Sequence, residues 1–404
     1  MFREKERERA EMKETASARR KRGEESPSAS TATDNGNAGV SEKGEESKRH
    51  RSVFKKVARA TLFTVRATSL QWKTIRGVPI RRRVQTLCVL LWLLGLAILP
   101  LLMWPLVFFA VFFTPLSPLV IGYLTWVFFF DDSAQTGKRS RPISRFRIWK
   151  QVRDYFPIRM IKTVEIESNR SYVFGYHPHG VISMGALVNF GTFASDFDKM
   201  YPGVNVHLLT LAGNFYMPVL REWILWMGLC DASRETCHNI LTKGEGESIL
   251  LAVGGAEESL DAFPGKYKLT LKNRKGFVRV ALKAGASLVP VISFGENELW
   301  GALPNPTGSK LRSFQEGMKK ILKFTFPIIH GRGIFNYNFG LMPFRRPIHT
   351  VVGAPILVDS PCDVDTEEGR KKVDQFHALY IQRLKDLFNE HRAEYAKGLE
   401  LEIK

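Results

Sequence analysis

Three motifs that mark common enzyme classes are missing from this sequence of 404 residues. The GxSxG elbow of serine hydrolases is absent, because the nearest candidate, Ser183, lacks the first glycine. There is also no GxxxxGK phosphate loop and no HExxH pair of the kind that holds zinc in proteases. A triad hydrolase, a kinase and a zinc protease therefore lose their best sequence support.

Cysteine is scarce as well. The chain has four cysteines, with no CxxC pair and no spacing typical of a zinc site, so neither a disulfide framework nor a metal finger is predicted. A reducing environment facing the cytosol fits this usage best. The four residues are Cys88, Cys230, Cys237 and Cys362.

Large apolar residues are scarce in residues 1–50, which are charged and rich in Ser, Thr, Gly and Ala, and residues 23–46 are almost free of apolar side chains. Such a segment cannot bury enough surface to fold, so we expect a disordered polar head. Its start also lacks the short apolar core of a secretory signal, and we expect the head to stay on the cytosolic side.

Acidic residues are missing from residues 51–83, where ten Lys and Arg residues occur among apolar ones. This pattern is typical of a basic juxtamembrane segment on anionic lipid, and a flexible solvated linker is the alternative. The net charge of +19 also raises nucleic acid as a partner. Because the charge lies beside an apolar stretch and no nucleic-acid module is present, we expect no nucleic-acid partner.

Residues 84–130 carry no charged side chain at all. One membrane crossing needs about 20 residues, so this stretch is long enough for a transmembrane helical hairpin with a turn. Four prolines favour a turn, and Lys and Arg on both flanks place both ends on the cytosolic side. A re-entrant wedge within one leaflet is the alternative. The prolines are Pro100, Pro105, Pro115 and Pro118.

Residues 141–157 combine apolar residues at helical spacing with Arg and Lys. The pattern predicts an amphipathic helix on the membrane surface or, as an equal alternative, an ordinary half-buried helix.

Beyond this helix, short apolar runs alternate with helical patterns, which predicts an α/β domain with a mainly parallel sheet and flanking helices over residues 131–404. The expected strands are 172–176, 206–211, 248–253, 287–294 and 349–352. The expected helices are 216–228, 235–243, 275–284, 309–324 and 366–391.

The run Tyr176-His177-Pro178-His179-Gly180 follows the first of these strands. Functional sites of parallel sheets lie at the carboxyl ends of strands, which is where both histidines fall. An imidazole titrates near neutral pH and can take a proton from a hydroxyl group and return it to a leaving group. A single histidine is more often structural, but the proline and glycine beside these two favour a functional site.

An orienting carboxylate must come from elsewhere in the chain, because no HxxxxD pair is present. Glu257 and Glu258 follow an apolar strand and two glycines, and either belongs to the site or begins a solvated helix. A basic stretch that includes Arg274 and Lys275 leads into a helix and suits a phosphate-bearing ligand, although charge runs are usually solvated. Further polar residues in apolar surroundings are Arg234, His330 and Arg332.

Taken together, these motifs resemble the type-2 diacylglycerol acyltransferase family, which includes monoacylglycerol acyltransferases and some wax synthases. The resemblance runs from about Arg83 to the C-terminus and is greatest to the diacylglycerol acyltransferases. Besides the hairpin, it rests on residues 153–157 (RDYFP), 174–180 (FGYHPHG), 211–215 (LAGNF), 217–222 (MPVLRE), 253–256 (VGGA), 273–278 (NRKGFV), 294–298 (FGENE) and 330–333 (HGRG).

The resemblance implies a glycerolipid acyltransferase-like fold and transfer of an acyl group from acyl-CoA to diacylglycerol, forming triacylglycerol. It implies His179 as general base, with His177 and Glu258 completing the catalytic set. We expect substrate-binding roles for Pro178, Gly180, Arg234, Arg274, Lys275 and His330.

A thiolate is a good leaving group, so we expect no metal and no cofactor for this reaction, with acyl-CoA as co-substrate and membrane lipids as further partners. The expected location is the endoplasmic reticulum membrane, as a multi-pass protein with both termini cytosolic, and the lipid droplet. The sequence does not decide whether the protein forms a homo-oligomer. The alternatives are a monoacylglycerol or wax-alcohol acyltransferase and a non-catalytic lipid-droplet protein.

Overall fold

The computed structural model describes residues 77–136, 141–303, 308–322, 327–335 and 339–404, all within one compact unit. The predicted head, residues 1–50, and residues 51–76 of the predicted basic segment lie outside the described residues.

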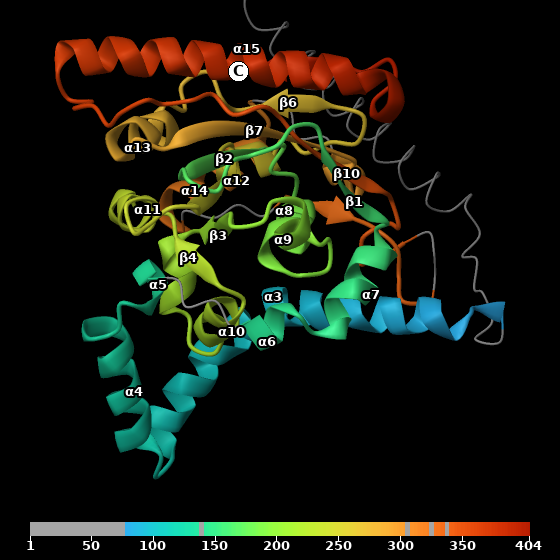
Figure 1. The fold of residues 1–404 in the computed structure, drawn as a ribbon. Helices are drawn as coiled ribbons and strands as arrows, with labels where there is room; N and C mark the ends of the chain where they lie inside the picture. Colours follow the sequence, from blue (N-terminus) through green and yellow to red (C-terminus); the bar gives the residue numbers. More distant parts are fainter. Residues whose placement is uncertain (1–76, 137–140, 304–307, 323–326, 336–338) are drawn as a thin grey trace, which may run out of the picture. The chain divides into compact units, whose positions relative to one another are not determined.

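A seven-stranded sheet in the order β1-β10-β7-β2-β5-β3-β4 organises this unit (Figure 1). All neighbouring strands are parallel except β10 and β7, which confirms the prediction of an α/β fold with a mainly parallel sheet. Two further pairs are β11 with β6 and β8 with β9. The strands are β1 (Ile158–Lys162), β2 (Tyr172–His177), β3 (Asn205–Thr210), β4 (Leu229–Asp231), β5 (Glu247–Ala252), β6 (Tyr267–Leu269), β7 (Ser287–Phe294), β8 (Gly301–Ala302), β9 (Ile329–His330), β10 (Ile348–Val352) and β11 (Leu401–Ile403).

All five expected strands are present, and each boundary is within one residue of its prediction. The helical elements are α3 (Ile80–Phe113), α4 (Ser117–Phe129), α5 (Ser133–Thr136), α6 (Arg141–Ser144), α7 (Arg147–Tyr155), α8 (Met184–Ala186), η2 (Leu187–Gly191), α9 (Phe197–Met200), η3 (Ala212–Tyr216), α10 (Leu220–Trp226), α11 (Arg234–Leu241), α12 (Gly255–Ser259), α13 (Gly276–Ala284), η4 (Glu296–Glu298), α14 (Lys310–Leu322) and α15 (Glu367–Tyr395).

The central strand β2 is buried on both faces. Tyr172 and Phe174 point into the core on the side of α8 and α9, whereas Val173 points into the core on the side of α13 and α15. This alternation follows from the two-residue period of a strand. Figure 1 shows α15 along one face of the sheet, with α8 and α9 on the opposite side.

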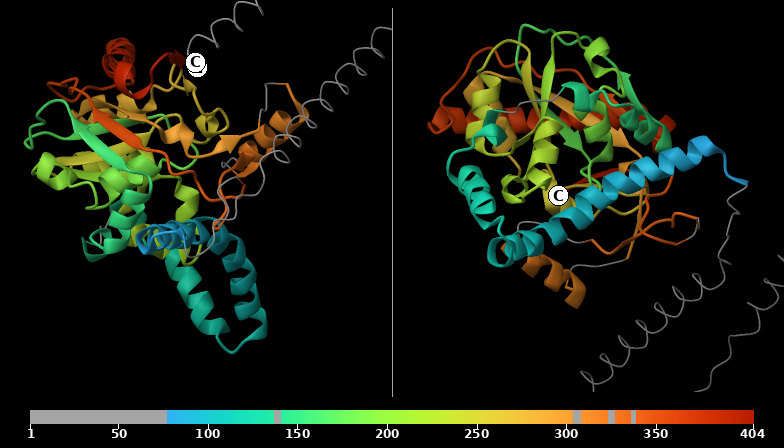
Figure 2. Two further views of the ribbon diagram at one scale, coloured as in Figure 1. Left: turned by 90° about the vertical axis from the view of Figure 1, so that its right-hand side faces the viewer. Right: turned by 90° about the horizontal axis from the view of Figure 1, so that it is seen from below.

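The uncharged stretch forms two helices, α3 and α4, joined by a short turn at residues 114–116. Figure 2 shows them side by side, apart from the sheet. No single helix of the described residues is long and apolar enough to cross a membrane, but the two parts of α3, bent by 53° between Leu96 and Leu101, together meet that length and composition. Large apolar side chains on both helices are exposed, among them Leu101, Phe108, Phe112, Leu119 and Phe129.

Polar contacts tie α4 to the globular part. The Tyr123 hydroxyl donates to a carboxylate oxygen of Glu222 at 2.7 Å, and Glu222 lies on α10. Directly after α4, Asp131 forms a buried ion pair with Arg221 of α10. Both charges are desolvated, so removing either partner would leave a costly unpaired charge.

Two predicted helices are interrupted, which corrects the sequence prediction. The helix expected over 141–157 is divided into α6 and α7, because the Ser144 carbonyl accepts a hydrogen bond from the Phe193 amide at 3.0 Å and Arg145 lies over the Phe193 ring. On α7, Trp149 and Val152 are buried, so the half-buried alternative applies.

The helix expected over 216–228 begins only at Leu220. Proline disfavours the helical conformation in the residue before it, which here is Met217. Val219 then adopts a positive φ of 68°, so a helix cannot continue through this point.

Candidate functional site

The strand β2 ends at His177, and the loop after it carries the second histidine, His179. Because β2 lies between β7 and β5, this loop is at the middle of the carboxyl edge of the sheet. The predicted position of the two histidines is thus confirmed.

The imidazole of His179 is half-buried and has one nitrogen committed to the backbone. Its Nδ1 lies 3.0 Å from the Gly180 carbonyl oxygen, which can only accept, so Nδ1 carries the hydrogen. The Nε2 atom is left with its lone pair, and no hydrogen-bond partner for it occurs among the described residues. Burial lowers the pKa of His179 and outweighs the opposing hydrogen bond to Gly180, so the ring is neutral near pH 7.

His177 is in a different environment, because its ring is fully buried. Its Nε2 lies 3.1 Å from the Tyr380 hydroxyl of α15, and that hydroxyl donates to the Gly175 carbonyl at 3.1 Å. Since the hydroxyl hydrogen is used, Nε2 of His177 is the donor. Burial lowers the pKa of His177 to about 3, so this ring stays neutral and is not placed to exchange protons.

Glu258 is 2% exposed and supports the loop through the backbone. One carboxylate oxygen accepts from the His179 amide at 2.6 Å, and the other accepts from the Thr270 amide at 3.0 Å. Burial raises the pKa of Glu258 to about 7, against the effect of both hydrogen bonds. The glutamate therefore fixes the backbone of His179, and no hydrogen bond joins it to the His179 ring among the described residues.

The predicted phosphate-binding cations lie at helix starts near this turn. Arg274 pairs with Glu257, the neighbour of Glu258, at 2.8 Å, and Lys275 pairs with Asp374 at 2.7 Å. Both pairs are exposed, and exposed pairs are worth little, so the cations can exchange partners for a ligand. Arg234 begins α11 and is exposed.

The predicted residue His330 lies on β9, outside the main sheet. Its exposed ring packs edge-on against Phe344, with 6.1 Å between centroids, and beside Gly301. Among the described residues, no hydrogen bond or ring contact joins it to the histidine loop. Pro178 and Gly180 are part of that loop and are buried.

Sequence reasoning missed one glutamate of the site, Glu296. It lies two residues after β7 and contacts the histidine loop from the side opposite Glu258. Its signal in the sequence was its position directly after an apolar strand that neighbours β2.

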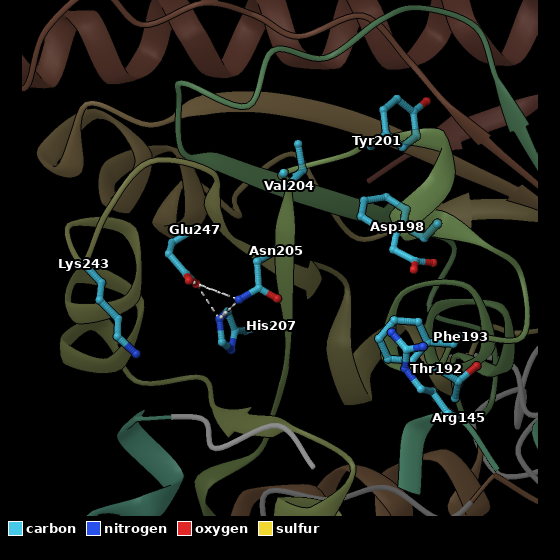
Figure 3. A pocket seen from close by; sticks show the side chains of 12 residues that line it. Arg145, Thr192, Phe193, Asp198, Tyr201, Val204, Asn205, His207, Lys243 and Glu247 are labelled. Atoms are coloured by element: carbon cyan, nitrogen blue, oxygen red, sulfur yellow. Dashed lines mark hydrogen bonds and ion pairs between the residues drawn. The ribbon is translucent and has the colours of Figure 1, made fainter. Parts of the chain in front are cut away.

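A second polar cluster lies at the opposite, amino edge of the sheet. His207 and Glu247, at the starts of β3 and β5, are joined at 2.7 Å between Nε2 and a carboxylate oxygen, and Asn205 donates to the same glutamate (Figure 3). They line a cavity of about 530 Å³ whose rim carries Arg145 and Lys243. No group of three metal-ligating side chains forms anywhere in the described ranges.

A half-buried neutral imidazole at the carboxyl edge of a parallel sheet, with a free nitrogen and a buried glutamate behind it, is the type of site found in enzymes that use a general base. A family model described as "Diacylglycerol acyltransferase" matches residues 109–404, and the chain belongs to that family.

Individual relatives cover most of the chain. It is 42% identical over 329 residues to diacylglycerol O-acyltransferase 2B of Umbelopsis ramanniana, covering 81% of this chain and 93% of that protein. It is 44% identical to diacylglycerol O-acyltransferase 2 of Dictyostelium discoideum, covering 78% and 94%. It is also 42% identical to 2-acylglycerol O-acyltransferase 1 of Bos taurus, covering 79% and 94%.

Among solved structures, the 1-acyl-sn-glycerophosphate acyltransferase of Thermotoga maritima aligns with 76% of this chain and 98% of its own. The TM-score is 0.32 and the sequence identity 13%, a likeness too distant to bear on the reaction.

Proposed function

We propose that this protein is an acyl-CoA-dependent diacylglycerol acyltransferase that forms triacylglycerol at a membrane surface. The observation that carries the proposal is the state of His179. Its Nδ1 hydrogen is held by the Gly180 carbonyl, and its Nε2 lone pair has no partner among the described residues. The membership of the chain in the diacylglycerol acyltransferase family supports the choice of substrates.

In the proposed mechanism, Nε2 of His179 takes the proton of the diacylglycerol hydroxyl as its oxygen attacks the thioester carbonyl of acyl-CoA. The tetrahedral intermediate then collapses, the carbon–sulfur bond breaks, and the imidazolium returns its proton to the departing thiolate. General-base catalysis of this kind typically contributes about 10²–10⁴ in rate. The step balances without a redox or metal cofactor, and we assign none.

Supporting roles follow from the contacts. Glu258 sets the His179 backbone through its amide, and Tyr380 holds His177 in place behind the loop. Arg274 and Lys275, with Arg234, bind the phosphates of acyl-CoA, because the first two pair with solvent-accessible carboxylates and Arg234 is exposed. We keep Pro178 and Gly180 as substrate-side residues of the loop, and His330 as a more remote contact for the lipid substrate.

The hairpin of α3 and α4 attaches the enzyme to the membrane. The outer part of α3 (Leu101–Phe113) and α4 have 13 residues each, which makes each arm about 20 Å long. The hydrocarbon core is about 30 Å thick, so these lengths favour the re-entrant wedge over two full crossings. In either arrangement both flanks stay on the cytosolic side. The endoplasmic reticulum and the lipid droplet are the proposed locations, with membrane lipids as partners and a homo-oligomer open.

A second candidate is a 2-acylglycerol acyltransferase. It is favoured by the 42% identity to the bovine 2-acylglycerol O-acyltransferase 1, which is close to the 44% of the Dictyostelium enzyme. Wax-alcohol transfer and a non-catalytic lipid-droplet role are further rivals. The non-catalytic role leaves a free general base without a purpose.

To test the proposal, the purified protein is placed in phospholipid vesicles and given labelled acyl-CoA. Diacylglycerol, 2-monoacylglycerol and a long-chain alcohol are present together as acceptors in equal amounts. We expect triacylglycerol as the main product, and about 10²–10⁴ times less of it from His179→Ala protein purified in the same way. Mainly diacylglycerol would favour the second candidate. No product from any acceptor would favour the non-catalytic role.

A further inference from the structure

The histidine loop is held between the two strands that flank β2. Strand β5 leads into α12, whose Glu258 binds the His179 amide. Strand β7 leads into η4, whose first residue, Glu296, reaches the other end of the same loop. The sheet order β7-β2-β5 therefore places one buried glutamate on each side of the loop.

Glu296 is 1% exposed and has three hydrogen-bond donors around it. One carboxylate oxygen accepts from the Met184 amide at 2.5 Å. The other accepts from the Gly185 amide at 3.1 Å and from the Tyr176 hydroxyl at 3.0 Å. These donors belong to the last residues of β2 and the first residues of α8, so one side chain ties together both ends of the segment that carries His179.

Two glycines of this segment are explained by the same carboxylate. Gly180 has a φ of 60°, and a Cβ there would lie 2.6 Å from Cγ of Glu296. A Cβ on Gly185 would lie 2.9 Å from the Glu296 carboxylate and would overlap the Tyr176 hydroxyl. Distances below 3.0 Å are too short for a real Cβ contact, so the loop is built around this glutamate.

We propose that Glu296 is a positioning residue for acyl transfer, which fixes the segment 180–185 from the β7 side as Glu258 fixes His179 from the β5 side. This inference rests on the proposed role of His179 as the base. Glu296 itself touches no reacting atom. Its effect reaches the reaction through the position of the His179 ring, and it should therefore act on turnover more than on binding of acyl-CoA.

The test compares Glu296→Ala, Glu296→Gln and Tyr176→Phe with wild type, with equal amounts of folded protein and varied acyl-CoA. The matched control is Glu298→Gln, on the same short helix, whose carboxylate accepts only the Gly265 amide among the contacts described. A displacement of about 1 Å costs about 100-fold in rate, so the kcat of Glu296→Ala should fall by about that factor. Its KM for acyl-CoA should change by less than about twofold, because only transition-state positioning is lost.

The conservative variants keep the experiment informative if Glu296→Ala does not fold. Glutamine retains an oxygen that can accept from one amide, and Glu296→Gln should recover to within about tenfold of wild-type kcat. Tyr176→Phe removes one of the three donors and should fall between Glu296→Gln and wild type. Glu298→Gln should match wild type.

A double variant separates this inference from the proposed function. If Glu296 acts through His179, then Glu296→Ala causes no further loss in a His179→Ala background. The positioning role alone would be overturned if Glu296→Ala lowered kcat in the His179→Ala background by the same factor as in wild type. It would also be overturned if Glu296→Ala and Glu296→Gln had a normal kcat while His179→Ala had lost its activity. A normal turnover of His179→Ala would overturn the proposed base and the positioning role with it.

Discussion

Two histidine–glutamate pairs lie at opposite edges of one sheet, and the pair with the better dyad geometry is the less suited to catalysis. At the amino edge, the His207 ring contacts Glu247 directly at 2.7 Å, and its Nδ1 lies 3.8 Å from the thiol sulfur of Cys230. At the carboxyl edge, Glu258 accepts a hydrogen bond from the His179 backbone amide, and none joins it to the His179 ring among the described residues.

The difference teaches that a histidine suited to act as a base is recognised by a ring nitrogen that has no hydrogen-bond partner within the protein. Both ring nitrogens of His207 already have neighbours, and Cys230 is fully buried, with its pKa raised to about 12 by burial. No thiolate forms there at neutral pH. His179, in contrast, has one ring nitrogen, Nε2, without a hydrogen-bond partner among the described residues.

The largest expected effect tests directly which of the two histidines takes part in acyl transfer. His179→Ala should lower acyl transfer by about 10²–10⁴, because the proposed general base is removed. His207→Ala should keep turnover within about threefold of wild type, since the residue has no part in the proposed chemistry. Both are measured as triacylglycerol formed from labelled acyl-CoA at equal amounts of folded protein. Similar losses in the two variants would contradict the assignment of the site to the carboxyl edge.

The second effect concerns pH, and its sign differs between the two edges. The pKa of Glu258 is raised to about 7 in the folded protein, above the usual 4.5 of the unfolded chain. Its protonated form therefore contributes to the free energy of unfolding fully below pH 4.5, and this contribution is lost as the pH rises through 7. The stability of Glu258→Gln relative to wild type should therefore increase over this range, by about 3 kcal/mol.

At Glu247 burial is outweighed by hydrogen bonds from His207 and Asn205, and the pKa is lowered. Its stabilisation is present above pH 4.5 and lost on acidification. Glu247→Gln should thus lose stability relative to wild type as the pH rises through 4.5. Thermal unfolding of the three proteins between pH 4 and 8 measures both trends, and parallel curves would refute them.

The third effect concerns the cations. Arg274→Ala should raise the KM for acyl-CoA about fivefold, which corresponds to roughly 1 kcal/mol, with little change in kcat. Lys243→Ala is the matched control, because Lys243 is an exposed cation at the rim of the cavity on the amino edge. Equal KM changes in both variants would indicate only a general charge effect. Raised salt should reduce the difference between Arg274→Ala and wild type.

The smallest effect is expected at Cys230. Because its thiol is buried and protonated, Cys230→Ala should retain turnover within about twofold of wild type. Iodoacetamide should not modify Cys230 in the folded enzyme, as peptide mass analysis would detect. A strong loss of activity would mean that the Cys230–His207–Glu247 arrangement is a reactive triad after all.

The strands were predictable because their signal is local. Residues 287–294 form a mainly apolar run that matches a buried strand, and β7 has the same bounds. The position of the two histidines followed from the same pattern. The break at Ser144 was not predictable, since it depends on a contact with Phe193, which is distant in the sequence. The late start of α10 had a local signal in the proline after Met217, but the positive φ of Val219 did not show in the sequence.

The support of the site was only partly visible in the sequence. Glu258 could be named as an acid after two glycines, but whether it meets the ring or the amide of His179 depends on coordinates. Glu296 stood out less, because its importance depends on β7 being the neighbour of β2, which a single sequence does not reveal. Motifs give the residue types, whereas the order of strands decides which of them meet.

Strand β2 lies between β5 and β7, which both follow it in the chain, and this order matters while the ribosome makes the polypeptide. N-terminal segments emerge first, so the hairpin leaves the ribosome well before Glu296 and Tyr380 exist. The histidine segment acquires its contacts with Glu296 and Tyr380 only when nearly the whole polypeptide has been made. A polypeptide that ends before Glu296 therefore contains both histidines but lacks the buried carboxylate that binds the Met184 and Gly185 amides.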